Sequence, residues 1–538
     1  MNSPDILLIV LDTQRADRLG CYGHDRPITP NLDGFAGGGA LFERAVSPAQ
    51  WTIPSHASLF TGLYPTAHGV TQSSQSLSSG RPHLAQVLRQ LGYETVGFCN
   101  NPLVGVLNNG FKRGFGAFYN YGGAFPSLPR QSNPWPWPLN RVAEGYTQFL
   151  RRISYPIQNF FGQSDLAFRV SLHAFLTPLW SKMANFKGQN ERSVDDVVQF
   201  LEERETKPAD RPLFLFLNLM ETHLPFWPPG EFIDRVAPYF RESKAARTIL
   251  RTWNREAYRW AAPLAEPLDE LESRVLNDLY DAEVAYQDDY LGRLFAALAA
   301  RGRSRDTLTI IVADHGDGLG DHGYFGHAFV AYDELVHVPL IAHWPARLAA
   351  GARVATPVST RRVFHTLIDA AAPTPETAAV VAEVLAEDAP NVRRLSLRHT
   401  LRGRDPEGAT AFSEVYPPLN FVRAIETRQP ELLTQFRCLA TRRAVVRPMR
   451  ATSGAAAPLK LIHVDGTADA LYDLAADPRE QDDLLTQQPE IAAALDLALE
   501  QMAQRMERER EAQPAGAAVD LDSDELLRQR LRGLGYLE

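Results

Sequence analysis

Residues 6–12, Ile6-Leu7-Leu8-Ile9-Val10-Leu11-Asp12, form an apolar run that ends in a carboxylate. A continuous apolar run of this length is typical of a strand buried on both faces of a parallel sheet. In open α/β sheets, ligands bind beyond the carboxyl ends of the strands. Asp12 is therefore a candidate metal ligand, although an Asp that caps the following loop would give the same pattern.

A second stretch, SPAQWTIPSHASLFTG at residues 47–62, contains a candidate nucleophile. Pro54 suits the first turn of a helix, so Thr52 falls at or just before a helix N-terminus. Unpaired backbone N–H groups and the helix dipole favour an anion there and lower the pKa of a hydroxyl. For a lone Thr before Pro, helix capping is the far commoner role, so only partners from distant parts of the chain can establish a catalytic one.

Three further apolar segments, at residues 95–98, 213–217 and 307–312, predict strands that polar residues follow directly. Asn101 comes after the first of these strands, His223 after the second, and the adjacent pair Asp314 and His315 after the third. A carboxylate and an imidazole after one strand can bind one cation. His322 and His327 come next in the same Gly-rich loop, and helices are expected at residues 84–91, 194–201 and 278–300.

Composition limits the partners of the chain. The 538 residues are 45% apolar and 22% charged, which is ordinary for a globular protein. A formal net charge of −9 with interspersed signs argues against nucleic acid. Three scattered cysteines do not form a disulfide framework, and the first apolar run lacks the flanks of a signal peptide. These features predict a cytoplasmic protein.

Residues 119–189 differ from the rest in their density of Trp, Phe and Tyr, interleaved with Pro and with Arg151 and Arg152. We interpret this stretch as an insertion. A buried helical subdomain would account for the aromatic residues. Peripheral contact with a membrane surface or with an apolar ligand would account for them too, and no run is long enough to span a bilayer.

Six motifs occur in an order that resembles the sulfatase family of the alkaline phosphatase superfamily. They are ILLIVLDTQRADRLGCYG (6–23), WTIPSHASLFTGLYPTAHGV (51–70), ETHLPFWPP (221–229), IIVADHGDGLGDHGYFGH (310–327), YDELVHVPLI (332–341) and LYDLAADPREQDDL (471–484). The resemblance implies an α/β fold with a doubly wound, mostly parallel mixed sheet and a smaller C-terminal α+β domain with antiparallel strands. We expect the catalytic domain at 1–400, the smaller domain at 401–490 and a helical tail at 491–538.

The resemblance also implies roles for individual residues. One divalent metal ion would be held by Asp12, Thr52, Asp314 and His315, with Thr52 also the nucleophile. His223 and His327 stand where the family contacts the substrate oxyanion or protonates the leaving group. Additional candidates for substrate binding are His56, Asn101 and His322.

Two departures from the family pattern affect the expected chemistry. Sulfatases carry Cys or Ser where this chain has Thr52, and they oxidise it to formylglycine, but threonine cannot give an aldehyde. Thr13 follows Asp12, and His315 replaces the usual Asn, so fewer hard oxygen ligands remain and Mn or Zn is favoured over Ca, with Mg also possible. We expect hydrolysis of a small-molecule or lipid-like phosphate or sulfate ester, phosphate ahead of sulfate. Transfer to an alcohol is the alternative, and an inactive binding module a distant one.

Overall fold

The computed structural model describes residues 3–121, 187, 189–206, 210–255, 257–450, 456–512 and 515–519. Most of the aromatic-rich stretch at 119–189 and the end of the C-terminal tail lie outside these ranges. The predicted insertion, its membrane or ligand contact and the last part of the tail therefore stay predictions.

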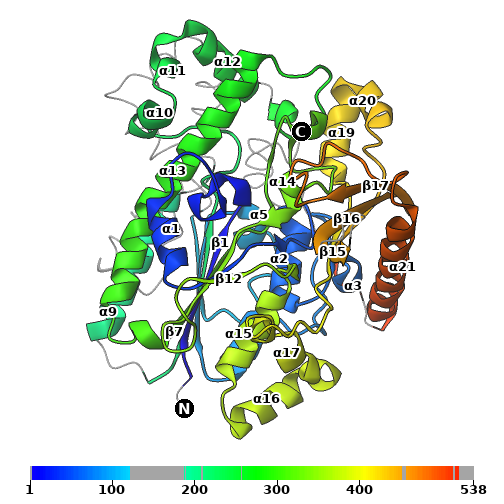
Figure 1. The fold of residues 1–538 in the computed structure, drawn as a ribbon. Coiled ribbons are helices and arrows are strands. Elements are labelled where there is room, and N and C mark those ends of the chain that lie inside the picture. The colour runs from blue at the N-terminus through cyan, green and yellow to red at the C-terminus, as the bar shows by residue number, and fades with distance from the viewer. Residues whose placement is uncertain are drawn as a thin grey trace.

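The central sheet has eight strands and is mostly parallel (Figure 1). In spatial order the strands are β12 (Ala352–Val354), β2 (Ala40–Phe42), β11 (Leu340–His343), β7 (Thr307–Val312), β1 (Asp5–Leu11), β6 (Leu213–Leu219), β4 (Glu94–Cys99) and β5 (Ala117–Asn120). The antiparallel pairs are those that β11 makes with its neighbours β7 and β2.

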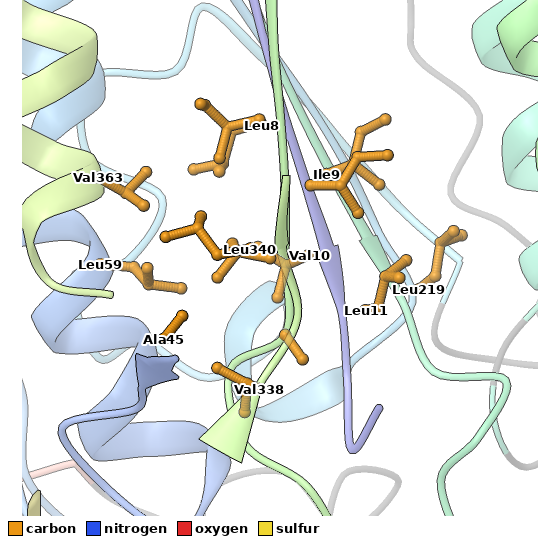
Figure 2. Packing of buried hydrophobic residues seen from close by; sticks show 14 of the residues in the cluster. Leu8, Ile9, Val10, Leu11, Ala45, Leu59, Leu219, Val338, Leu340 and Val363 are labelled. Atoms are coloured by element: carbon orange, nitrogen blue, oxygen red, sulfur yellow. The ribbon is translucent and has the colours of Figure 1, made fainter. Parts of the chain in front are cut away.

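β1 lies inside the sheet, between β7 and β6, and every one of its residues is buried. This confirms the expectation from the apolar run. Successive side chains of a strand point to opposite faces. In Figure 2, Leu8 and Val10 accordingly lie on the side of Leu59 and Val363, and Ile9 lies on the other side.

Helices cover both faces of the sheet (Figure 1). On one face α13 (Glu270–Ala300) lies beside α1 (Pro30–Gly37) and α9 (Asn190–Thr206). On the other face α15 (Arg362–Ala371) packs against α2 (Thr52–Thr61) and α4 (Leu84–Gln90). The three helices predicted from periodicity are α4, α9 and α13, of which the last begins eight residues earlier than the sequence indicated.

A smaller antiparallel sheet, in the order β14-β15-β16-β17, follows in the chain. The long helix α21 (Pro489–Glu511) packs against it through a separate apolar cluster that includes Leu495 and Leu499. The predicted two-part architecture is thus present, while the boundaries at residues 401 and 491 stay predictions. The strands are β14 (Ala411–Val415), β15 (Arg442–Arg450), β16 (Ala456–Val464) and β17 (Thr467–Asp473).

The sheet order explains how distant polar residues meet. β7, β1, β6 and β4 are adjacent and parallel, so their carboxyl ends lie at one edge. Asp314, Asp12, Glu221 and Asn101 each follow one of these strands by one to two residues. None of the helices in the described part of the chain is both long and apolar enough to cross a membrane.

Candidate active site

Asp12, Asp314 and His315 form a compact buried group at this edge of the sheet. One potential ligand atom from each lies within 4.8 Å of the others. His315 Nε2 is 3.4 Å from Asp314 Oδ2 and 3.9 Å from Asp12 Oδ1. All three side chains are fully buried, so the group is shielded from bulk water.

The free atoms of this group fit a divalent cation. Within the described ranges, Asp12 Oδ1 and Asp314 Oδ2 have no hydrogen-bond partner. His315 Nδ1 lies 2.8 Å from the Gly316 carbonyl oxygen, to which it donates. That bond fixes the tautomer and leaves the Nε2 lone pair directed at the carboxylates. Two carboxylate oxygens and one imidazole nitrogen suit Mn or Zn.

Gly316 is required by close packing. A Cβ atom at this position would lie 2.0 Å from the backbone oxygen of Glu334. The Gly316 N–H donates to Leu335 O at 2.7 Å, which holds the loop against α14 (Asp333–Val336). The Asp-His-Gly sequence therefore combines two candidate ligands with the one residue that lets their loop approach its neighbour.

The electrostatics of the group also favour a cation. Burial and the charge of Asp314 raise the pKa of Asp12 well above its usual range. Burial would raise the pKa of Asp314 too, but His315 and His56 together lower it. Burial lowers the pKa of His315 to about 4, so its imidazole is neutral near pH 7. Two crowded carboxylates with a neutral imidazole leave negative charge that a metal ion would offset.

Thr52 is the first residue of α2 and points at this group. Its Oγ1 is 3.3 Å from His315 Nε2 and 3.5 Å from Asn101 Nδ2. The start of α2 is fastened to the end of β7, because Ser55 Oγ donates to the Asp314 carbonyl oxygen at 2.6 Å and Ser47 Oγ donates to the same oxygen. Thr52 is fully buried, at the positive end of the helix dipole.

Asn101 has two roles here. Its Oδ1 accepts from Leu103 N at 2.8 Å and so caps the short helix α5 (Pro102–Gly105). Its Nδ2 donates to Asp12 Oδ2 at 2.6 Å. The amide therefore orients Asp12, a candidate ligand. The predicted contact between Asn101 and a substrate is supported only by the 3.5 Å distance from its Nδ2 to Thr52 Oγ1.

His56 lies directly behind Thr52 and Asp314. Its Nδ1 is 3.0 Å from the Thr52 carbonyl oxygen and 3.2 Å from Asp314 Oδ2. Its N–H is directed at the carbonyl, while Nε2 is 3.5 Å from Asn218 Nδ2. His56 thus supports the start of α2 and the nearby carboxylate.

Two more histidines stand over the group. The ring of His327 is 4.6 Å from that of His315 and 5.0 Å from that of His223. Burial lowers the pKa of His327 to about 4 and that of His223 well below its usual range. His327 Nδ1 is 2.9 Å from Asp317 Oδ1, and its Nε2 has no hydrogen-bond partner among the residues that the structure describes.

His322 is not brought to this group. Its Nδ1 lies 2.9 Å from Glu334 Oε1, its Nε2 lies 3.1 Å from the Glu480 carbonyl oxygen, and its ring stacks on Tyr332 at 3.7 Å. Burial would lower its pKa, but Glu334 and Glu480 raise it to about 9. His322 therefore fastens the loop that carries His327 to the C-terminal part of the chain.

A fully buried lysine lies in the same contact between the loop that carries His322 and the C-terminal part of the chain. Lys460, on β16, has its Nζ 2.9 Å from Asp333 Oδ1 and 2.8 Å from Glu480 Oε1. Asp333 also pairs with Arg44, and its N–H donates to Glu480 Oε2 at 2.6 Å. The C-terminal sheet thus holds the segment that follows the candidate ligands.

Sequence reasoning missed several supporting residues. Asn218 lies within the apolar strand β6, where its side chain accepts from Asn101 N at 3.0 Å. Thr13 has φ 59°, unusual for a β-branched residue, and its N–H donates to Asp314 Oδ1 at 3.3 Å. The polar residue inside an apolar strand was a readable signal for Asn218. Nothing in the sequence indicated the backbone of Thr13.

Comparison with known proteins agrees with the fold and the motifs. The sulfatase family model matches residues 4–373. The uncharacterized sulfatase YidJ of Escherichia coli is 25% identical over 370 residues, 68% of each chain. The multifunctional alkaline phosphatase superfamily protein PehA of Trinickia caryophylli is 28% identical over 380 residues, 63% of this chain and 68% of that one. The phosphonate monoester hydrolase of Agrobacterium radiobacter has the same fold, with TM-score 0.60, 22% identity and coverage of 94% and 96%.

Proposed function

We propose, from the premise that this chain belongs to the sulfatase family, that it is a metal-dependent hydrolase of phosphate or sulfate esters that uses Thr52 as its nucleophile. The observation that carries the proposal is the position of Thr52 Oγ1, 3.3 Å from His315 Nε2 and beside two carboxylate oxygens without hydrogen bonds among the described residues. The N-cap residue of α2 is Trp51, and Thr52 is the first residue of the helix itself, so its hydroxyl does not have the capping role that the sequence also allowed.

Asp12, Asp314 and His315 would hold the cation, with Thr52 Oγ1 as a fourth ligand. When bound, a divalent cation supplies positive charge that polarises the ester oxygen and lowers the pKa of the Thr52 hydroxyl. Asn101 keeps Asp12 in place through its 2.6 Å hydrogen bond. The N-terminus of α2 adds the partial positive charge of its first N–H groups at the transferred group.

In the proposed reaction, Thr52 Oγ1 releases its proton to solvent and forms a bond to phosphorus as the P–O bond to the leaving alcohol breaks. His327 is placed to protonate the departing oxygen through Nε2, because its Nδ1–H donates to Asp317 Oδ1 and leaves Nε2 available. His327 is neutral at pH 7 without substrate, and the negative charge of a bound phosphate would raise its pKa. His223, 5.0 Å away between ring centres, would contact the transferred group. Water then attacks phosphorus, giving a proton to His327, which is neutral again after the first step; the P–O bond to Thr52 breaks, and Thr52 Oγ1 regains its proton.

Phosphate chemistry is favoured because of the side chain of Thr52. A hydrated aldehyde can expel sulfate by collapsing, but a threonine ester must be cleaved by attack on the transferred group itself. The relatives include proteins named as sulfatases, and the fold is that of a phosphonate monoester hydrolase, so both ester classes are to be assayed. An alcohol in place of water would make the protein a phosphotransferase.

The decisive experiment is a screen of aryl sulfate, phosphate monoester, phosphodiester and phosphonate substrates, with the protein loaded separately with Mn, Zn, Mg or Ca. We expect turnover of a phosphorus ester that depends on the metal and is absent in Thr52→Ala. Added glycerol separates hydrolysis from transfer, because transfer yields glycerol phosphate in addition to phosphate. Turnover of every substrate at wild-type rate in Thr52→Ala would remove Thr52 from the reaction.

A further inference from the structure

A second pocket lies at the far end of the helix that begins with Thr52. α2 ends at Thr61, and Gly62 follows in the left-handed conformation with φ 74°. A cavity of about 170 Å³ opens there, between the end of α2, α15, α17 (Ala389–Leu395) and α21. With ten residues at about 1.5 Å each, the helix separates this cavity from Thr52 by roughly 15 Å.

The lining of this cavity is rich in arginine. Among the described residues that line it, four are arginines and two are carboxylates. One carboxylate is close to an arginine, with Arg505 Nε 3.4 Å from Glu509 Oε1. Glu407 lies outside the lining but pairs with Arg361. The four arginines therefore face three carboxylates, which leaves one net positive charge at the cavity. The charged lining residues are Arg81, Arg361, Arg394, Arg505, Asp388 and Glu509.

Two deeply buried polar atoms in the lining, one on an arginine and one on a tyrosine, lack a hydrogen bond of good geometry among the described residues. Arg361 and Tyr64 are 3% and 1% exposed, and within the described ranges Arg361 Nε and Tyr64 Oη have no partner of good geometry. The guanidinium lies over the face of the tyrosine ring, 4.4 Å from its centroid. Its charge and its approach to the hydroxyl are among the interactions that act on the pKa of both groups. Buried donors left unused are costly, so they indicate a ligand that accepts from them.

The negative end of α2 does not cancel this positive charge. Arg361 Nη1 donates to the Gly62 carbonyl oxygen at 2.9 Å, which offsets the partial charge at the helix terminus. His365, also in the lining, is neutral, because burial and the charges of Arg361, Arg362 and Arg394 hold its pKa well below the usual range. Arg362 is itself paired with Asp405, 2.5 Å away.

We infer that this pocket binds a tetrahedral oxyanion, phosphate or sulfate, alone or as the charged group of a small ester. Guanidinium groups match such an anion in geometry as well as in charge. A water needs about 15 Å³ of such volume, so the cavity has room for one oxyanion with a small substituent but not for a polymer. The inference is independent of the chemistry at Thr52.

Two arginines at the rim give a test that spares the buried framework. Arg394 is exposed and Arg505 half-buried, so the double variant Arg394→Ala/Arg505→Gln keeps Arg81, Arg361 and Tyr64 in place. Arg393 and Arg508 are exposed on the same two helices and do not line the cavity. Arg393→Ala/Arg508→Gln is therefore a control with the same change of net charge on α17 and α21.

The measurement is calorimetric titration of the full chain with inorganic phosphate and with sulfate at constant ionic strength, using Thr52→Ala as background to stop turnover. We expect the rim variant to weaken one binding event by roughly tenfold for each guanidinium removed, and the control to change it by less than about twofold. Melting temperatures in chloride confirm that the variants fold. The inference would be overturned by equal affinities in the rim variant and its parent, or by equal losses of affinity in the rim and control variants. It would also be overturned if neither phosphate nor sulfate bound.

Discussion

His315 Nε2 lies 3.3 Å from Thr52 Oγ1, where the end of β7 meets the start of α2. The contact joins residues that are far apart in the chain, and it is fixed from both sides. On the histidine side, the Gly316 carbonyl oxygen holds the tautomer. On the threonine side, hydroxyls of Ser47 and Ser55 tie α2 to the Asp314 backbone.

The first prediction concerns the proposed ligands. Asp314→Asn and His315→Ala should each lose bound metal and turnover together, because each removes one atom of a three-residue group. Changes behind the ligands typically cost about 10 to 100-fold in metal affinity, so loss of a ligand should cost more than tenfold. Elemental analysis of the purified variants and titration with Mn or Zn measure this. Full metal content and normal activity in either variant would exclude that residue as a ligand.

The second prediction separates the nucleophile from the metal site. Thr52→Ala should abolish turnover and retain metal, since three protein ligands stay, while Thr52→Ser should keep part of the activity. Intact-mass measurement of the wild type should show an unmodified threonine. Acid quenching during turnover of a phosphate ester should add the mass of a phosphoryl group, and the Ala variant is the matched blank.

A third prediction tests the hydrogen bond from Asn101 to Asp12. In Asn101→Ser the hydroxyl can still cap α5, but no amide reaches Asp12 Oδ2. We expect metal affinity to fall about 10 to 100-fold with a small change in melting temperature. Asn101→Ala, which loses the cap as well, should add roughly 1 kcal/mol of destabilisation. If both variants bind metal like the wild type, the hydrogen bond has no role in the site.

The fourth prediction is a pH dependence of stability. Glu334 and Glu480 raise the pKa of His322 in the folded state to about 9, above the ordinary histidine value of 6.5. Its stabilising contribution should be fully present below about pH 6.5 and lost as pH rises through 9. Urea unfolding of His322→Gln and wild type should differ by on the order of 2 kcal/mol at pH 6 and converge near pH 10. A difference that does not vary with pH would assign His322 a packing role only.

The fifth prediction addresses the aromatic stretch at 119–189, which lies mostly outside the described residues. If it favours an apolar leaving group, longer esters of one phosphate group should have higher kcat/KM. Burial of about 100 Å² of substrate at ~25 cal/mol per Å² would give roughly 2.5 kcal/mol, nearly a hundredfold. Trp135→Ala/Trp137→Ala should reduce this dependence on chain length. Equal kcat/KM for short and long esters in the wild type would contradict the idea.

The sheet and the edge where the candidate ligands gather were predictable because both depend on local patterns. Asp12 and the pair Asp314-His315 each follow an apolar strand, and parallel strands bring their carboxyl ends together. His322 shows where this reasoning stops. It lies in the same Gly-rich loop as His327, yet contacts with Tyr332 and Glu480 hold it elsewhere. The spacing of residues around His322 contains no information about its contact with Glu480, which is 158 residues away in the chain.

The Lys460, Asp333 and Glu480 cluster has a consequence for biosynthesis. The loop that carries His327 rests on residues of the C-terminal part, which leave the ribosome long after Asp12 and Thr52. From His315, the last candidate ligand, to Glu480 the ribosome adds 165 residues. At about 5–20 residues per second, the nascent chain spends roughly 10 to 30 seconds with all its candidate ligands made and that support missing. The newborn protein is therefore held without a completed site until almost its whole length has been translated.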